Sequence, residues 1–144
     1  MDMLEVNTPE LLEKLKSLEL KVWKGLSDIE VRELFQRKKA YIFRSSTQDV
    51  GYLVYSYRRG RAYIEDLVII DSSNFITIMR SIEKLFKPLS IVALVEPHFM
   101  WFFSPKRERI LKNSGYKLDK VRRFKLFGED FLYVRLVYYE SSFG

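Results

Sequence analysis

The sequence contains no cysteine and only one histidine, His98, among its 144 residues. Without cysteine there are no disulfides, thiolate zinc clusters or thiol nucleophiles, and a single imidazole excludes any site that needs two. We therefore expect no metal site. The sequence also lacks an apolar run near the roughly 18 residues that a membrane-spanning helix needs. The N-terminal stretch MDMLEVNTPELLEKLK is acidic and predicts a helix rather than a targeting segment. We expect a soluble, cytoplasmic protein with no membrane partner.

Basic residues outnumber acidic ones, because 25 lysines and arginines face 19 aspartates and glutamates and leave a net charge of +6. Such an excess favours an anionic partner and leaves open whether it is a nucleic acid, a phosphorylated ligand or an acidic surface. Apolar residues make up 47% of the chain, which suffices for the core of one domain over residues 1–144. Heavy use of Lys, Glu, Arg, Ile and Tyr without cysteine is typical of a thermophile.

Helical spacing opens the chain. Four leucines recur at intervals of three and four residues after Pro9, and Asn7 or Thr8 can cap that helix; they are Leu11, Leu12, Leu15 and Leu18. After a break at Gly25, the stretch SDIEVRELFQRKK predicts a second helix, with Ser27 and Glu30 as a capping box.

From Ala40 the period changes to two, which indicates strands. AYIFRSS, a turn at TQD, VGYLVYSYRRG and RAYIEDLVII predict three antiparallel strands, with Arg59 and Gly60 as a tight hairpin turn. A helix over Phe75–Phe86 follows and stops before Pro88. The apolar run LSIVALVEP then predicts a buried strand parallel to the Arg61–Ile70 strand.

A last helix, from Ser104 to Gly115, precedes two strands that predict a closing hairpin. The expected order is therefore αα-βββ-α-β-α-ββ. This predicts an α/β fold of the α+β type, with a mixed, mainly antiparallel sheet flanked by helices in one domain.

Two stretches, AYIEDLVI and RILKNSGYK, together with this order, resemble the GNAT acyltransferase superfamily. The resemblance implies a GNAT-like fold, acetyl-CoA as cofactor and acyl transfer to an amine. It also implies that the backbone of Leu67, Val68 and Ile69 pairs with the pantetheine arm of acetyl-CoA. In the family, a glycine-rich turn after this strand holds the pyrophosphate.

Here that turn reads IDSSNFIT, is shorter, and contains neither glycine nor arginine. The phosphate cradle is therefore degenerate, with Asp71 where an anion would approach. The helix N-terminus at Ser72, Ser73 and Asn74 is what remains to attract the phosphates. Capping side chains more often satisfy such N–H groups internally, so we favour a capped corner over a phosphate site.

The resemblance also bears on proton transfer. Many relatives use a tyrosine where this chain has Leu111, and we expect Tyr116 to be a core residue rather than the acid. Glu65 matches a position where some relatives carry a general base. Pleat alternation predicts that Asp66 faces the other side of the strand. The alternative for Glu65 is an ion pair with an arginine such as Arg61.

Basic residues gather late in the chain, with aromatics among them, as on surfaces that follow a nucleic-acid backbone; they are Lys106, Arg107, Arg109, Lys112, Lys117, Lys120, Arg122, Arg123 and Lys125. The aromatic run HFMWFF, residues 98–103, is either core or an interface. Three hypotheses follow: an acetyl-CoA-dependent N-acyltransferase, a non-catalytic basic module that binds nucleic acid or protein on a degenerate GNAT-like scaffold, and a structural homodimer.

Overall fold

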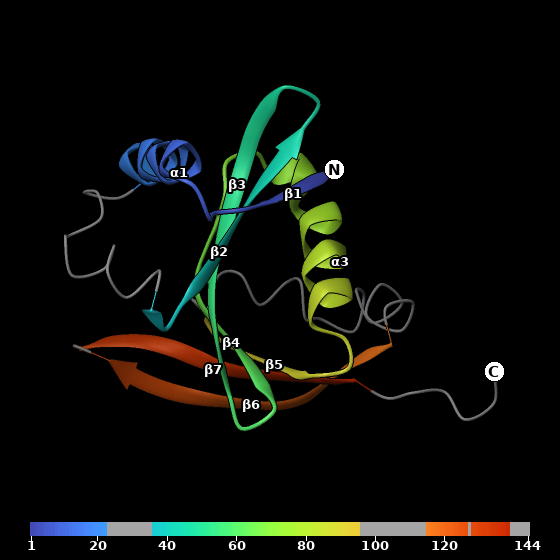
Figure 1. The fold of residues 1–144 in the computed structure, drawn as a ribbon. Coiled ribbons are helices and arrows are strands. Elements are labelled where there is room, and N and C mark those ends of the chain that lie inside the picture. The colour runs from blue at the N-terminus through green and yellow to red at the C-terminus, as the bar shows by residue number, and fades with distance from the viewer. Residues whose placement is uncertain (23–35, 96–114, 127, 139–144) are drawn as a thin grey trace. The chain divides into compact units, whose positions relative to one another are not determined.

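The computed structural model describes residues 1–22, 36–95, 115–126 and 128–138 (Figure 1). The chain divides into two compact units. The first comprises Met1–Tyr57 and Ile64–Ser81, and the second comprises Arg58–Tyr63 and Ile82–Gly144.

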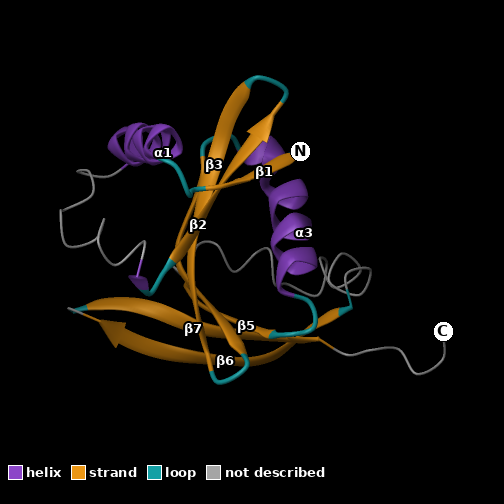
Figure 2. Ribbon diagram, viewed as in Figure 1, coloured by secondary structure: helices purple, strands orange, loops and turns teal. Residues whose placement is uncertain are grey.

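The sheet of the first unit follows the order β1-β2-β3-β4, shown as orange arrows in Figure 2. These strands are β1 (Asp2–Glu5), β2 (Lys39–Ser45), β3 (Gln48–Arg58) and β4 (Arg61–Ile69). β1 runs antiparallel to β2, with Met3 opposite Phe43, and β2 runs antiparallel to β3, with Ile42 opposite Tyr52.

The strand β1 corrects the expected helical N-terminus. Its four residues are too few for an alternating pattern to stand out, and only pairing with β2 in the folded chain makes them a strand. The order of elements therefore begins with a strand before the first helix.

The two hairpin turns of this sheet differ in how well the sequence predicted them. Arg59 and Gly60 have φ of 49° and 74°, which confirms the expected tight turn. The turn between β2 and β3 lies at Ser46 and Thr47, so it starts one residue before the predicted TQD and shares only Thr47 with it, because Gln48 already pairs with Ser45. The register of this hairpin also shifts between Phe43 and Arg44, which leaves Val50 as an extra residue in β3.

Helix α1 (Pro9–Val22) confirms the first predicted helix. Thr8, rather than Asn7, caps it, since its Oγ1 accepts a hydrogen bond of 3.2 Å from the N–H of Leu11. The apolar stripe of the helix packs on one face of the sheet, in a buried cluster made of Val6, Leu15, Leu18, Ala40, Ile42, Tyr52, Val54 and Val68. The residues of β3 in this cluster are even-numbered, as one face of a strand requires.

After β4 the chain enters a short 3-10 turn, η1 (Ser72–Asn74), and helix α3 (Phe75–Phe86). Ile78, Met79 and Ile82 are buried at the predicted helical spacing. The helix ends at Phe86, before Pro88, as expected.

The sheet of the second unit has the order β5-β7-β6. β5 (Ser90–Val95) and β6 (Tyr116–Leu126) both run antiparallel to β7 (Glu129–Tyr138). The β6–β7 pair is the closing hairpin that the sequence predicted. The side chain of Tyr116 is fully buried in this unit, which confirms its expected place in the core.

Several expectations fall outside the described residues: the helix from Ser27, the helix from Ser104, the run 98–103 and the cations Lys106, Arg107, Arg109 and Lys112. The single domain, the parallel pairing of β4 with β5, the homodimer, the cytoplasmic location and the thermophilic source stay predictions. Within the described ranges, no helix is long and apolar enough to cross a bilayer.

Candidate active site

Glu65, on β4, is held by polar neighbours within the first unit. Its Oε1 accepts a hydrogen bond of 2.8 Å from the Ser56 hydroxyl, and its Oε2 lies 3.9 Å from the Lys38 ammonium. Ser56 is buried, whereas the Glu65 side chain is 30% exposed. The carboxylate is therefore oriented by β3 and still accessible. Its ion-pair partner is Lys38, so the suggested pairing with Arg61 is replaced.

The neighbouring carboxylate, Asp66, faces the same side of the sheet as Glu65. Its Oδ2 accepts a hydrogen bond of 2.6 Å from the hydroxyl of Tyr52, and Tyr52 lies four residues before Ser56 on β3. Residues an even number apart on a regular strand share a face, and β3 pairs regularly with β2 from Gly51 to Tyr55.

The prediction that Glu65 and Asp66 point to opposite faces is therefore wrong. β4 must depart from simple alternation between these two residues, as happens at a bulge, where one extra residue disturbs the pleat. The signal in the sequence is the adjacent pair Glu65 and Asp66, which interrupts strict alternation in AYIEDLVI.

The backbone of β4 beyond these carboxylates shows which residues face away from β3. The Val68 carbonyl points at Gly51, where a Cβ would overlap its oxygen, and the Ile70 N–H donates a 2.9 Å hydrogen bond to the Val50 carbonyl. Backbone groups of successive strand residues point to alternate sides. Of the three predicted pantetheine-binding residues, Leu67 and Ile69 therefore direct their N–H and C=O groups away from β3, and Val68 does not.

The turn after β4 is closed by Asp71. Its Oδ1 accepts a hydrogen bond of 2.9 Å from the Ser73 N–H, and its backbone carbonyl accepts one of 3.0 Å from the Asn74 N–H. The bond from Ser73 lowers the pKa of the Asp71 carboxyl, which is therefore ionised at neutral pH. The expected capped corner is confirmed, with Asp71 as the capping side chain. Two of the N–H groups predicted to attract phosphate are engaged within the turn.

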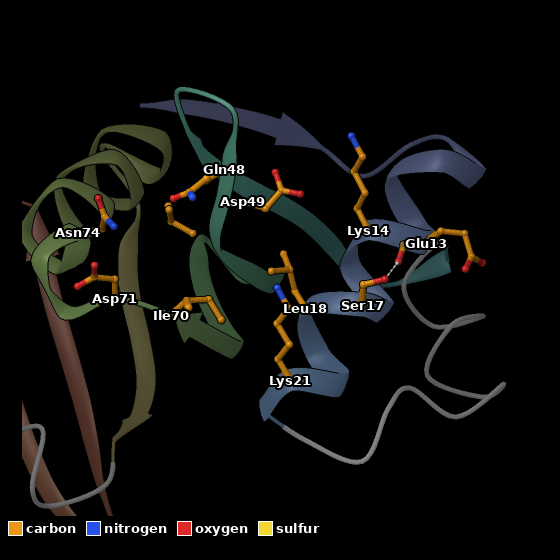
Figure 3. Close-up of a pocket in the computed structure, with 11 residues that line it drawn as sticks. Glu13, Lys14, Ser17, Leu18, Lys21, Gln48, Asp49, Ile70, Asp71 and Asn74 are labelled. Atoms are coloured by element: carbon orange, nitrogen blue, oxygen red, sulfur yellow. Dashed lines mark hydrogen bonds between the residues drawn. The ribbon is translucent and has the colours of Figure 1, made fainter.

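Beside this turn lies an open groove of about 560 Å³, drawn in Figure 3. Helix α1, the start of β3 and the end of β4 with its turn all contribute to it; the lining residues are Glu13, Lys14, Ser17, Leu18, Lys21, Gln48, Asp49, Val50, Ile70, Asp71 and Asn74. The sequence analysis assigned none of the α1 residues to a site. The feature that could have indicated them is the spacing of Lys14, Ser17, Leu18 and Lys21, which places these residues on one stripe of a helix.

Tyr116 does not fit a role as proton donor. Its hydroxyl donates a 2.8 Å hydrogen bond to the Leu89 carbonyl, and its ring packs against Tyr138 with centroids 5.5 Å apart. Burial, with a smaller contribution from Glu83, raises the pKa of the Tyr116 phenol above its ordinary value. The Tyr116 phenol therefore stays neutral, and its ring packs in the core of the second unit.

Comparisons with known proteins rest on structure, since no protein-family model and no curated protein sequence matches this chain. An N-acetyltransferase from Staphylococcus aureus Mu50 superposes with a TM-score of 0.64 at 10% identity, over 94% of this chain and 96% of that one. The aminoglycoside 6′-N-acetyltransferase from Enterococcus faecium gives 0.60 at 19% identity, over 94% and 95%. A Bacillus subtilis acetyltransferase solved in complex with CoA gives 0.52 at 14% identity, over 96% and 100%.

These matches extend over nearly the whole chain. Their identities are low enough that they establish architecture rather than substrate. The resemblance read from the sequence is thus confirmed at the level of the fold: the protein has the fold of the GNAT N-acetyltransferases.

Proposed function

We propose that this protein is an N-acyltransferase that uses acetyl-CoA to acetylate an amine. The observation that carries the proposal is the accessible Glu65 carboxylate, which Ser56 orients on strand β4 of a GNAT fold. The activity of its structural neighbours, named above, adds support. Acetyl-CoA would supply the activated acetyl thioester.

In this proposal Glu65 is the general base. An amine acceptor is an ammonium ion at neutral pH and must lose a proton to attack a carbonyl carbon. The carboxylate receives that proton directly or through one water, while the hydroxyl of Ser56 holds it in place through Oε1. The ammonium of Lys38 lies 3.9 Å from Oε2 and pairs with the other oxygen of the carboxylate.

Asp66 has a different role, because the hydroxyl of Tyr52 already occupies one of its oxygens. With Glu65 on the same face, it adds a second negative charge beside the proton acceptor. Two adjacent carboxylates attract a cationic acceptor and favour its approach through electrostatic complementarity. We therefore propose an ammonium-bearing acceptor rather than a neutral hydroxyl compound.

The cofactor would pair with Leu67 and Ile69 through the backbone edge of β4 that faces away from β3. The predicted phosphate contacts at Ser72, Ser73 and Asn74 contribute less, because the turn uses two of its N–H groups internally and carries the Asp71 charge. We expect a dissociation constant for acetyl-CoA in the high micromolar range or weaker, on the order of 5 kcal/mol of binding free energy.

Calorimetric titration of acetyl-CoA into the wild type and into Asp71→Asn tests this proposal. Asn also caps helices well, so the variant removes the charge and keeps the turn. We expect weak binding by the wild type and tighter binding by the variant. Tight wild-type binding would contradict the account of the turn but support the enzyme, whereas no heat from either protein would refute the acyltransferase.

A second candidate function rests on strand β6, where four cationic side chains are exposed: Lys117, Arg122, Arg123 and Lys125. Arg122 and Arg123 follow one another in a regularly paired stretch, so they face opposite sides of the strand. A strand with cations on both sides suits a non-catalytic module that binds a nucleic acid through its phosphates. Fluorescence anisotropy with a labelled single-stranded RNA tests it. The affinity should fall steeply between low and physiological salt concentration. An affinity that does not depend on salt, or no binding at low salt, would contradict this second function.

A further inference from the structure

The groove beside the turn presents one stripe of α1 to the end of β4. Lys14, Ser17 and Lys21 lie on this stripe, and Figure 3 shows them along the helix with the turn across from it. At 1.5 Å per residue, the backbones of Lys14 and Lys21 are about 10 Å apart. Because a lysine side chain is long and flexible, the two ammonium groups can reach one anionic group or two neighbouring ones.

The acidic residues of the groove already have partners. Glu13 lies 3.6 Å from the Lys16 ammonium, and Asp49 accepts a hydrogen bond of 2.9 Å from the guanidinium of Arg44. The carboxylate of Asp71 accepts the Ser73 N–H.

The two lysines of the groove, in contrast, have no such partners among the described residues. Within the described ranges, neither Lys14 nor Lys21 makes a hydrogen bond or an ion pair. The positive charge of both lysines is therefore available to a ligand. Lys16 and Arg44 offset the charges of Glu13 and Asp49, whereas the Asp71 carboxylate keeps its charge.

The rest of the lining suits an organic ligand. Leu18, Val50 and Ile70 provide apolar surface, while Gln48 and Asn74 carry amides that can donate hydrogen bonds. The volume of about 560 Å³ lies in the range that small-molecule sites occupy. A site with amides, an apolar patch and two available ammonium groups is complementary to an anionic organic molecule.

We propose that this groove binds the phosphate groups of a phosphorylated ligand through Lys14 and Lys21. This inference rests on the proposed function, in which the ligand is acetyl-CoA. Side chains of α1 then bind its diphosphate, because backbone N–H groups of the shortened turn are already hydrogen-bonded within it. The two lysines are binding residues for the cofactor, and the acetyl transfer itself does not involve them.

The test compares the wild type with Lys14→Gln/Lys21→Gln by calorimetric titration. Gln is as good a helix former as Lys, so α1 should persist. The matched control, Lys39→Gln/Lys84→Gln, removes the same net charge at two exposed positions outside the groove. Three probes are titrated: acetyl-CoA, inorganic pyrophosphate, and S-acetylpantetheine, which carries the thioester arm without any phosphate.

We expect the groove variant to bind acetyl-CoA at least about tenfold more weakly, since hydrogen bonds to charged groups are worth one to two powers of ten each. Pyrophosphate affinity should fall in parallel, S-acetylpantetheine affinity should stay within about twofold, and the control should match the wild type. An equal loss in the control would mean that net charge alone acts, and would overturn the proposal.

The outcomes separate this inference from the proposed function. If acetyl-CoA binds and the groove variant binds it as well as the wild type does, the inference fails and the acyltransferase stands. If the wild type binds pyrophosphate, loses it in the groove variant and never binds acetyl-CoA, the anion site stands and the acyltransferase fails. If no probe binds the wild type, both are overturned.

Discussion

The carbonyl oxygen of Val68 points at the position that a Cβ of residue 51 would occupy. It lies so close that only glycine fits there, between β3 and β4. Glycine is required at this position by contact, since its φ is not in the left-handed region. The contact lies between Glu65 on β4 and the turn at Asp71. It therefore determines how β4 presents its other backbone edge, where Leu67 and Ile69 are expected to meet the cofactor.

Replacing Gly51 with Ala should destabilise the protein by about 3 kcal/mol, at the upper end of overpacking costs, because the Cβ meets backbone rather than a movable side chain. Chemical denaturation measures the change. Gly60→Ala is the comparison: Gly60 has open space but a φ of 74°, so only backbone strain of about 1 kcal/mol applies. Equal losses in the two variants would contradict the close contact.

The charge of Asp71 should make stability depend on pH. Because the Ser73 N–H lowers the pKa of this carboxyl below its ordinary value of 3.8, the ionised cap stabilises the folded state. That contribution is present above pH 3.8 and is lost as the pH falls through the lowered pKa of the folded state.

Thermal unfolding of the wild type and Asp71→Ala, followed by circular dichroism, measures this effect. The wild type should have the higher melting temperature near neutral pH, and the difference should shrink on acidification below pH 3.8. Asp71→Asn should melt close to the wild type at neutral pH, since Asn retains a capping oxygen. A difference that stays constant with pH would show that the carboxylate does not cap the turn.

Tyr116→Phe should affect stability and leave chemistry unchanged. The variant removes the hydrogen bond to the Leu89 carbonyl and leaves that carbonyl without the hydroxyl, at a cost of about 1 to 2 kcal/mol. Denaturant unfolding measures the loss, and release of CoA thiol in an acetylation assay measures the rate. A large fall in kcat with unchanged stability would mean that Tyr116 is the proton donor after all.

If the protein is the proposed acyltransferase, Glu65→Gln should lower kcat for acetylation of a primary amine by about 100-fold or more, as expected for loss of a general base. Asp66→Asn should instead raise KM for the amine with a smaller effect on kcat, because in the proposal its carboxylate attracts the acceptor without taking its proton. Asp130→Asn, an exposed change on β7, is the matched control. Equal effects of the first two variants would refute the division of roles.

Local patterns in the sequence predicted much of this protein. The leucine spacing of α1, the alternation of β2 and β3, the glycine turn at Gly60 and the stop before Pro88 are near-neighbour effects that a short window contains. The capped corner at Asp71 belongs with them, since its hydrogen bonds span only two or three residues. Combined in order, these elements also predicted the GNAT-like fold.

Other features depend on contacts between residues far apart in the chain, and only the tertiary structure decided them. β1 is a strand because β2 offers it an unpaired edge. Glu65 and Asp66 share a face because Ser56 and Tyr52, on the neighbouring strand, hold them there. The groove exists because α1 packs across the ends of β3 and β4, which brings Lys14 and Lys21 opposite a turn some fifty residues away. A pattern read along the chain cannot report such placements, since packing across the sheet selects them.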